Sequence, residues 1–153
     1  MFALQRDIAS ELQAVAFALA ATAATAGGSG DNTAANGATI NVSTFPSGRQ
    51  ESVAFLIPAR AVLAAAATLT VSAKIQTSDD GSGWVDVVAP TTVLTLTGGS
   101  GGTTETGVGK IGVSLEYCGT YVRVVVTPDL SAANTDTASV SSVAVFGGPY
   151  KLS

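Results

Sequence analysis

Three acidic residues near the middle of the chain form its main local group of carboxylates. Asp79 and Asp80 are adjacent, and Asp86 follows within the same stretch. Paired carboxylates can run acid–base chemistry, and carboxylate oxygens are ligands for Ca²⁺, although the spacing here does not match an EF-hand loop. Asp79 and Asp80 also stand where a hairpin turn favours aspartate. A turn is therefore the main prediction, and a weak surface Ca²⁺ site is the alternative.

A second candidate site is aromatic and consists of Trp84, Tyr117, Tyr121 and Tyr150. Flat aromatic faces can stack on sugar rings. More often such residues line a core or a protein interface, where the apolar ring is buried and its polar edge finds a partner. Both interpretations stay open from the sequence.

Few groups in the chain suit nucleophilic or redox chemistry. Cys118 is the single cysteine, so it cannot form an internal disulfide, and the chain has no histidine to act as a general base. The glycine-rich stretch Gly98–Gly109 lacks the GxxxxGK[ST] pattern of a phosphate-binding loop, although Lys110 follows it. We predict that the chain is not an enzyme and holds no metal and no cofactor.

The stretch from Thr68 to Val88 is predicted to be a β-hairpin. Apolar and polar residues alternate through its first half, which is the period-2 pattern of a strand with one buried face. Ser78–Gly83 then reverses the chain, and Trp84–Val88 returns as the partner strand. The predicted inward side chains of the first strand are Leu69, Val71, Ala73 and Ile75.

Similar patterns predict the other elements. The expected strands are Gln13–Thr25 (with a helix as the alternative), Ala38–Val42, Gln50–Ile57, Thr92–Thr97, Lys110–Glu116, Gly119–Thr127 and Ser139–Phe146. Pro58 is expected to end one strand, Pro90 to introduce another, and Pro128 to end a third. The expected loops are Gly27–Gly37, Gly98–Gly109 and Ser131–Asp136, with a helical turn or a loop at Ala59–Ala67.

Three details of these strands can be tested in a structure. In Gly119–Thr127 the sequence places Val122, Val124 and Val126 inward and Tyr121, Arg123 and Val125 outward. A change of phase near the C-terminus predicts a β-bulge at Ser141 and Ser142. The run Val53–Ile57 is apolar on both parities, which predicts a strand covered on both faces, by a second sheet and a loop or by a partner subunit.

Composition limits the function classes. The 153 residues are 46% hydrophobic and only 12% charged, the net charge is −4, and the basic residues are scattered. Because nucleic-acid binding needs a cluster of basic residues, we predict no nucleic-acid partner. The apolar segment Ala14–Ala26 is too short to span a bilayer and lacks the positive start of a secretory signal, so we predict no membrane partner.

The predicted fold class is all-β. About eight short strands separated by turns are typical of an antiparallel β-sandwich or jelly roll. We expect residues 1–13 to form an N-terminal arm, either a short helix or irregular, and residues 14–153 to form a single jelly-roll domain.

In several stretches the chain resembles the jelly-roll cement, or decoration, proteins that cover the heads of tailed bacteriophages. The resemblance lies in LQAVAFALAATAATAG near the N-terminus, in the hairpin LTVSAKIQTSDDGSGWVDV, in YVRVVVTP and in the closing SVAVFGGP. It implies a structural virion protein, commonly a homotrimer, made in the host bacterial cytoplasm and located on the capsid exterior. There it would bind the major capsid protein and cement neighbouring subunits.

We also hypothesise where such contacts would form, because the arm carries apolar residues with little to bury against. The arm and the Gly98–Gly109 loop are expected to contribute, and the candidate interface residues are Phe2, Leu4, Ile8, Leu12, Tyr121 and Tyr150. The alternative function is a carbohydrate- or receptor-binding β-sandwich module of a phage tail or a secreted protein. The sequence leaves open which capsid would be bound, and whether the chain is a monomer or a trimer before binding.

Overall fold

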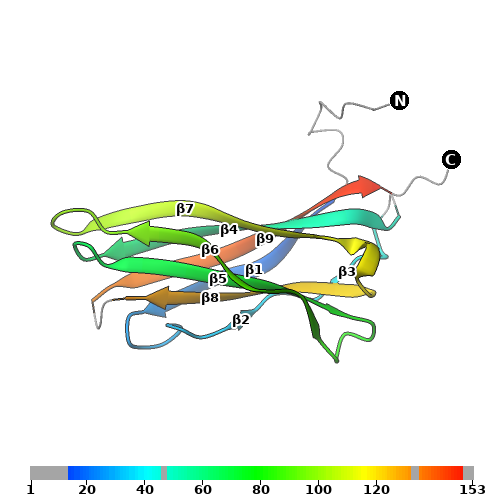
Figure 1. Cartoon of the computed structure of the whole chain (residues 1–153), viewed down its shortest axis with the longest axis horizontal. Coiled ribbons are helices and arrows are strands. Elements are labelled where there is room, and N and C mark those ends of the chain that lie inside the picture. Colours follow the sequence, from blue (N-terminus) through cyan, green and yellow to red (C-terminus); the bar gives the residue numbers. More distant parts are fainter. Residues whose placement is uncertain (1–13, 46–47, 132–134, 150–153) are drawn as a thin grey trace.

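The computed structural model describes residues 14–45, 48–131 and 135–149, which form nine strands and one short 3-10 helix (Figure 1). In chain order these are β1 (Ala14–Thr25), β2 (Ala35–Asn36), β3 (Ile40–Asn41), β4 (Gln50–Leu63), β5 (Thr68–Ser78), β6 (Val85–Thr97), β7 (Thr103–Ser114), η1 (Leu115–Tyr117), β8 (Tyr121–Leu130) and β9 (Thr137–Pro149). Within those ranges no helix is long and apolar enough to cross a membrane.

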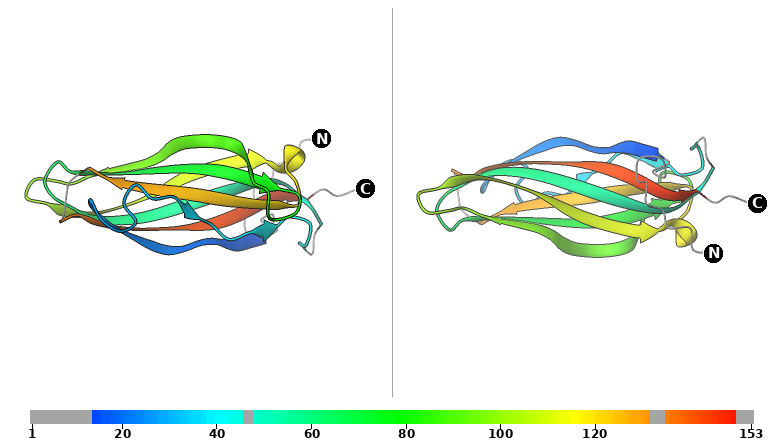
Figure 2. Two further views of the ribbon diagram at one scale, coloured as in Figure 1. Left: turned by 90° about the horizontal axis from the view of Figure 1, so that it is seen from below. Right: turned by 90° about the horizontal axis from the view of Figure 1, so that it is seen from above.

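The strands form two antiparallel sheets that pack face to face (Figures 1 and 2). Sheet A has the order β1-β9-β4-β7, and sheet B has the order β2-β8-β5-β6, with β3 also paired to β8. The prediction of an antiparallel β-sandwich is therefore confirmed. The N-terminal segment is a strand, as favoured over the helix, and the predicted hairpin is formed by β5 and β6.

The core lies between the sheets and follows the predicted alternation. The inward residues of β5 and β8 are buried almost completely: Leu69, Val71, Ala73, Ile75, Val122, Val124 and Val126. Sheet A contributes Phe55, Ile57 and Phe146, and the ring of Phe146 packs against that of Phe45 with centroids 4.6 Å apart. Burial of these side chains between the sheets is the main stabilising contribution to the fold.

Val125 differs from the prediction because it faces outward and is still buried. It lies in a small hollow of about 60 Å³ on the outer side of sheet B, where Ala34, Lys74 and Pro90 flank it. The short strand β2 pairs beside it, with Asn36 opposite Val125. An outward position is therefore not always a solvated one.

The prolines do not end strands as predicted. Pro58 lies inside β4, Pro90 inside β6 and Pro128 inside β8. Strand β6 is the edge of sheet B, and its pairing with β5 shifts register between Ala73 and Ile75, so the missing N–H of Pro90 is accommodated at an irregular edge. Beside Pro58, the Ser142 hydroxyl donates to the Leu56 carbonyl at 3.0 Å.

The predicted β-bulge at Ser141 and Ser142 is wrong. The β4–β9 register has no shift, and Ser142 is buried in phase with Val140 and Ala144. The register shifts of sheet A lie in β1, between Phe17 and Leu19 and again before Thr22. The sequence pattern changed phase because Val143 and Val145 are apolar residues on the outer side of the sheet.

The boundaries of two predicted loops and two predicted strands also change. Residues 59–63 complete β4, and the turn after it is residues 64–67, where Ala66 has a φ of 62°. The second glycine-rich loop is only residues 98–102, because β7 begins at Thr103. The strand predicted at Ala38–Val42 is reduced to β3, and the strand predicted at Lys110–Glu116 ends in η1.

Glycines inside β7 allow the two sheets to meet along one side. A Cβ on Gly109 would lie 2.9 Å from Val93 Cγ2 and 3.0 Å from the Val93 carbonyl oxygen on β6. At Gly107, the neighbouring atoms belong to the side chains of Leu94 and Leu96. These glycines give β6 space to cover the edge of the core, which explains why they occur within a strand.

We therefore predict that Gly109→Ala destabilises the protein by about 1–3 kcal/mol, because the new methyl group overlaps backbone that cannot move independently. The measurement is chemical denaturation followed by circular dichroism. Gly147→Ala is the matched control, because a Cβ there has only Ser52 Oγ within 4 Å, at 3.9 Å. Equal stability of Gly109→Ala and the wild type would contradict the close approach of β6 to β7 at Gly109.

Candidate functional site

The acidic turn between β5 and β6 is organised around Asp80. Its Oδ1 accepts hydrogen bonds from the Ser82 and Gly83 amides at 2.8 and 3.0 Å and from the Ser78 hydroxyl at 3.0 Å. Its Oδ2 accepts from the Ser82 hydroxyl at 2.7 Å. The Ser82 hydroxyl bond contributes most, followed by the two amides, and together they hold the pKa of Asp80 well below its usual range. Gly81 has a φ of 78°, as this turn requires.

The three carboxylates predicted as one group do not converge. Asp80 stabilises the turn, whereas Asp86 lies on β6 and pairs with side chains of β5. In the part of the chain that the structure describes, no group of three or more acidic, cysteine or histidine side chains is arranged to hold a metal ion. The turn interpretation is confirmed for Asp80 by its hydrogen bonds to Ser78, Ser82 and Gly83.

A chain of polar contacts crosses three strands on the outer side of sheet B. Lys74 Nζ lies 3.0 Å from Asp86 Oδ1, and Gln76 Nε2 donates to the same oxygen at 2.7 Å. Gln76 Oε1 accepts from Arg123 Nε at 2.9 Å, and the guanidinium of Arg123 lies 4.1 Å from the ring centroid of Trp84. Gln76, and secondarily Lys74, lower the pKa of Asp86, and partial burial lowers that of Arg123.

The aromatic residues proposed as a sugar platform are separated. Arg123 stacks on the ring of Trp84, Tyr117 on η1 is 82% exposed, and Tyr121 at the start of β8 is half-buried. Among the residues described, no ring contact joins these three aromatic side chains. Tyr150 and the predicted arm residues Phe2, Leu4, Ile8 and Leu12 lie outside the described residues.

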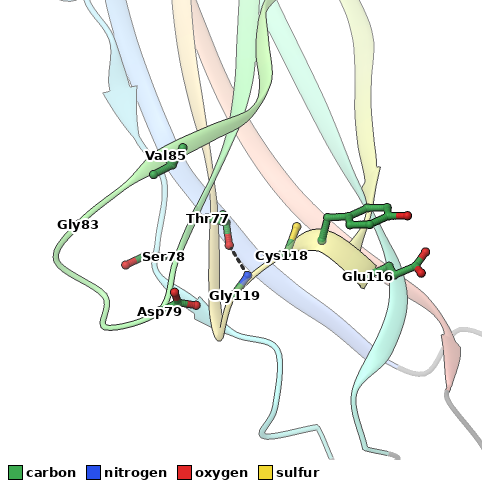
Figure 3. A pocket seen from close by; sticks show the side chains of 9 residues that line it. Thr77, Ser78, Asp79, Gly83, Val85, Glu116, Cys118 and Gly119 are labelled. Atoms are coloured by element: carbon green, nitrogen blue, oxygen red, sulfur yellow. Dashed lines mark hydrogen bonds between the residues drawn. The ribbon is translucent and has the colours of Figure 1, made fainter.

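A cleft of about 370 Å³ opens between the 79–84 turn and the corner that follows β7 (Figure 3). The turn contributes Asp79 and β6 contributes the exposed Val85, while Glu116 and Tyr117 come from η1 on the opposite side. The remaining lining residues are Thr77, Ser78, Gly83, Cys118 and Gly119. Nothing in the sequence indicated this cleft, since its two walls come from segments that are far apart in the chain.

Arg49 fixes the corner beside the cleft. Its Nη2 donates to the carbonyls of Leu115 and Cys118 at 2.8 and 2.5 Å, and the Gly119 amide donates to Thr77 Oγ1 at 2.8 Å. The Cys118 thiol is buried, and burial raises its pKa, which keeps it protonated and weakly nucleophilic. Arg49 therefore has a structural role at this corner. That role was not predicted from the sequence.

A further candidate site is the outer side of sheet A. One row crosses all four strands, because Phe17 pairs with Val143, Val143 with Leu56, and Leu56 with Lys110. Phe17 and Val108 are each 64% exposed, although both are large apolar residues. We name this surface the apolar face. It consists of Phe17, Leu56, Pro58, Val108, Val143 and Val145.

No other described strand lies over the apolar face, and Figure 2 (right) views the molecule from this side, with β9, β4 and β7 in front. The sequence had predicted that the run Val53–Ile57 is covered on both faces. Val53, Phe55 and Ile57 are covered by sheet B, whereas Ala54 and Leu56 remain partly exposed. Within the described chain, the second cover is missing.

Comparisons with known proteins do not identify the chain. No protein-family model matches it, and no curated protein matches it.

We predict that the stability of the wild type falls more steeply in acid than that of Asp80→Asn. The ordinary pKa of 3.8 is lowered in the fold, so the ionised carboxylate stabilises the turn above about pH 4, and this contribution is lost as the pH falls toward the lower folded-state value. Melting temperatures between about pH 5 and pH 2 provide the measurement. Ser82→Ala should give an intermediate slope, and parallel curves for all three proteins would refute the assignment.

The chain contains a single tryptophan, so its fluorescence reports on the Arg123 contact. In Arg123→Ala, Trp84 loses the covering guanidinium, and we expect a red-shifted emission, stronger quenching by iodide and a loss of about 0.5–1 kcal/mol of stability. Lys110→Ala, which removes a cation from the other sheet, should leave the emission unchanged. An Arg123→Ala spectrum identical to that of the wild type would show that the stacking does not persist in solution.

Proposed function

We propose that this chain is a structural virion protein that binds the outer surface of a phage capsid and cements neighbouring major capsid protein subunits. The observation that carries the proposal is the apolar face. Soluble monomers rarely expose contiguous apolar surface of this kind, and where they do it commonly marks a protein-binding site. The missing second cover over Leu56 is then provided by the partner.

The strand order supports the finer fold assignment, a jelly roll. If β2 and β3 count as one position, the first strand pairs with the last, β2 and β3 pair with β8, β4 pairs with β7, and β5 pairs with β6. Such nested pairs arise when one long antiparallel ribbon is rolled up on itself, as in jelly-roll domains of capsids. This supports the resemblance to phage cement proteins.

The proposed assembly is a homotrimer on the capsid exterior, with no catalytic role. Repetition by symmetry allows many modest contacts to hold a subunit firmly without any single strong site. The contacts in the cleft and on sheet B serve to hold the fold together. They bring together no nucleophile and base among the residues described.

The alternative, a carbohydrate- or receptor-binding module, is favoured by one observation. The strongly exposed ring of Tyr117 stands at the edge of a polar cleft, where a sugar could stack. Saturable binding on a glycan array that Tyr117→Ala or Trp84→Ala abolishes without unfolding would support this alternative.

The proposed function is tested by the copy number of the chain in purified virions, measured by mass spectrometry against the most abundant shell protein. We expect a copy number comparable to that of the shell protein, retained through gradient purification, because a cement repeats with the symmetry of the shell. A few copies per particle would instead indicate a tail or fibre protein, and absence from the virion would refute the proposal.

A further inference from the structure

Two positively charged side chains lie beside the apolar face. Lys110 on β7 lies opposite Leu56, and Arg60 on β4 lies opposite Thr106, so both project to the outer side of sheet A. Both are exposed, and the described residues give neither of them a hydrogen bond or an ion pair. The outward positions of β4 from Ala54 to Val62, and of β7 from Thr104 to Gly112, contain no carboxylate.

The other cations of the described chain have partners. Arg49 donates to the corner carbonyls, Lys74 pairs with Asp86, and Arg123 binds Gln76 and stacks on Trp84. In a chain with a net charge of −4, the cations that lack partners in the described structure are thus the ones beside the apolar face. This is a specific arrangement of charge and not an average property of the surface.

Charge complementarity therefore indicates a partner surface that carries carboxylates. We propose that the outer side of sheet A docks on a protein surface with an apolar centre and carboxylates that face Arg60 and Lys110, a proposal that rests on the function above, in which that surface belongs to the capsid shell. Apolar contact supplies buried area, while charged pairs fix the orientation and suppress wrong partners. The two cations thus determine the register of docking.

A second copy of this chain is a poor occupant of the same surface. Two apolar faces related by a two-fold axis would bring the Arg60 and Lys110 side chains of both copies into one interface, where the described outward positions of β4 and β7 offer no carboxylate to pair with them. Like charges placed together at an interface are unfavourable. The proposed trimer must therefore use other surfaces.

The test uses undecorated shells of the phage that encodes the chain, with binding of the full-length protein measured by co-sedimentation over a range of salt concentrations. We expect Arg60→Gln combined with Lys110→Gln to weaken binding at low salt about tenfold or more and to reduce the salt dependence. Lys74→Gln is the matched control for Lys110→Gln, because it removes the same charge from the opposite sheet and should change binding less than about twofold.

A zero-length carbodiimide cross-link provides the geometric readout. Lys110 should couple to a carboxylate of the shell protein, and Lys110→Arg should abolish that cross-link while it preserves binding, since the charge is retained. Phe17→Ser should weaken binding without a change in the oligomeric state of the free protein. Val85→Ser, which alters a residue of similar exposure on β6, is its control.

The outcomes separate the two proposals. If the wild type does not bind shells, the proposed function is wrong and this inference falls with it. If the wild type binds and the double variant binds equally well, the function stands and the docking surface is wrong. Dissociation of the free oligomer by Phe17→Ser would assign the face to a second copy. Binding of the wild type to phosphatidylglycerol vesicles but not to shells would assign it to a membrane surface, and either result overturns the inference.

Discussion

Apolar side chains that point inward from both sheets hold the sandwich together, and the rest of the molecule depends on that packing. Phe55 and Phe146 are fully buried on neighbouring strands of sheet A, and Leu69 and Val124 are fully buried in the same core from sheet B. Side chains alternate between the faces of a strand, so the register that buries these residues also determines which residues face out. The two outer surfaces are therefore a direct consequence of the core.

Those two surfaces differ in chemistry. The outer side of sheet B is polar in its central part, and its charged groups satisfy one another through the contacts from Lys74 to Trp84. Along sheet A, apolar side chains continue across all four strands, and the neighbouring cations are not neutralised within the described chain. A sandwich whose charged groups are paired on one outer side, and lack partners in the described chain on the other, is suited to bind in a single orientation.

Much of the fold was predictable because period-2 alternation is a local signal. The inward residues of β5 and β8 and the turn at Asp80 follow from neighbours in the sequence. Strand ends at Pro58 and Pro90 were not predictable, since a proline is tolerated or not according to which side of the strand is paired. The strand position of Gly109 was missed for a similar reason, because its role depends on Val93 in the other sheet.

The candidate site was predictable only in part. The double parity of Val53–Ile57 predicted a cover on both faces, and within the described chain only one face is covered, by sheet B. The outward valines of β9 gave a second signal, which was misread as a bulge because the pattern alone does not distinguish a shifted strand from an apolar outer surface. Arg49 and Arg60 carry no local pattern at all, and their different roles emerge only from their tertiary surroundings.

Strand length has a consequence for the footprint of the molecule. With 14 residues, β4 runs along the long axis of the sandwich and spans roughly 45 Å. A subunit that binds through the side of such a sheet lies flat, so its contacts extend along that whole length, whereas a subunit that binds through a loop tip stands upright and touches one spot. In that orientation, a single small domain is long enough to contact two adjacent subunits of the surface to which it binds.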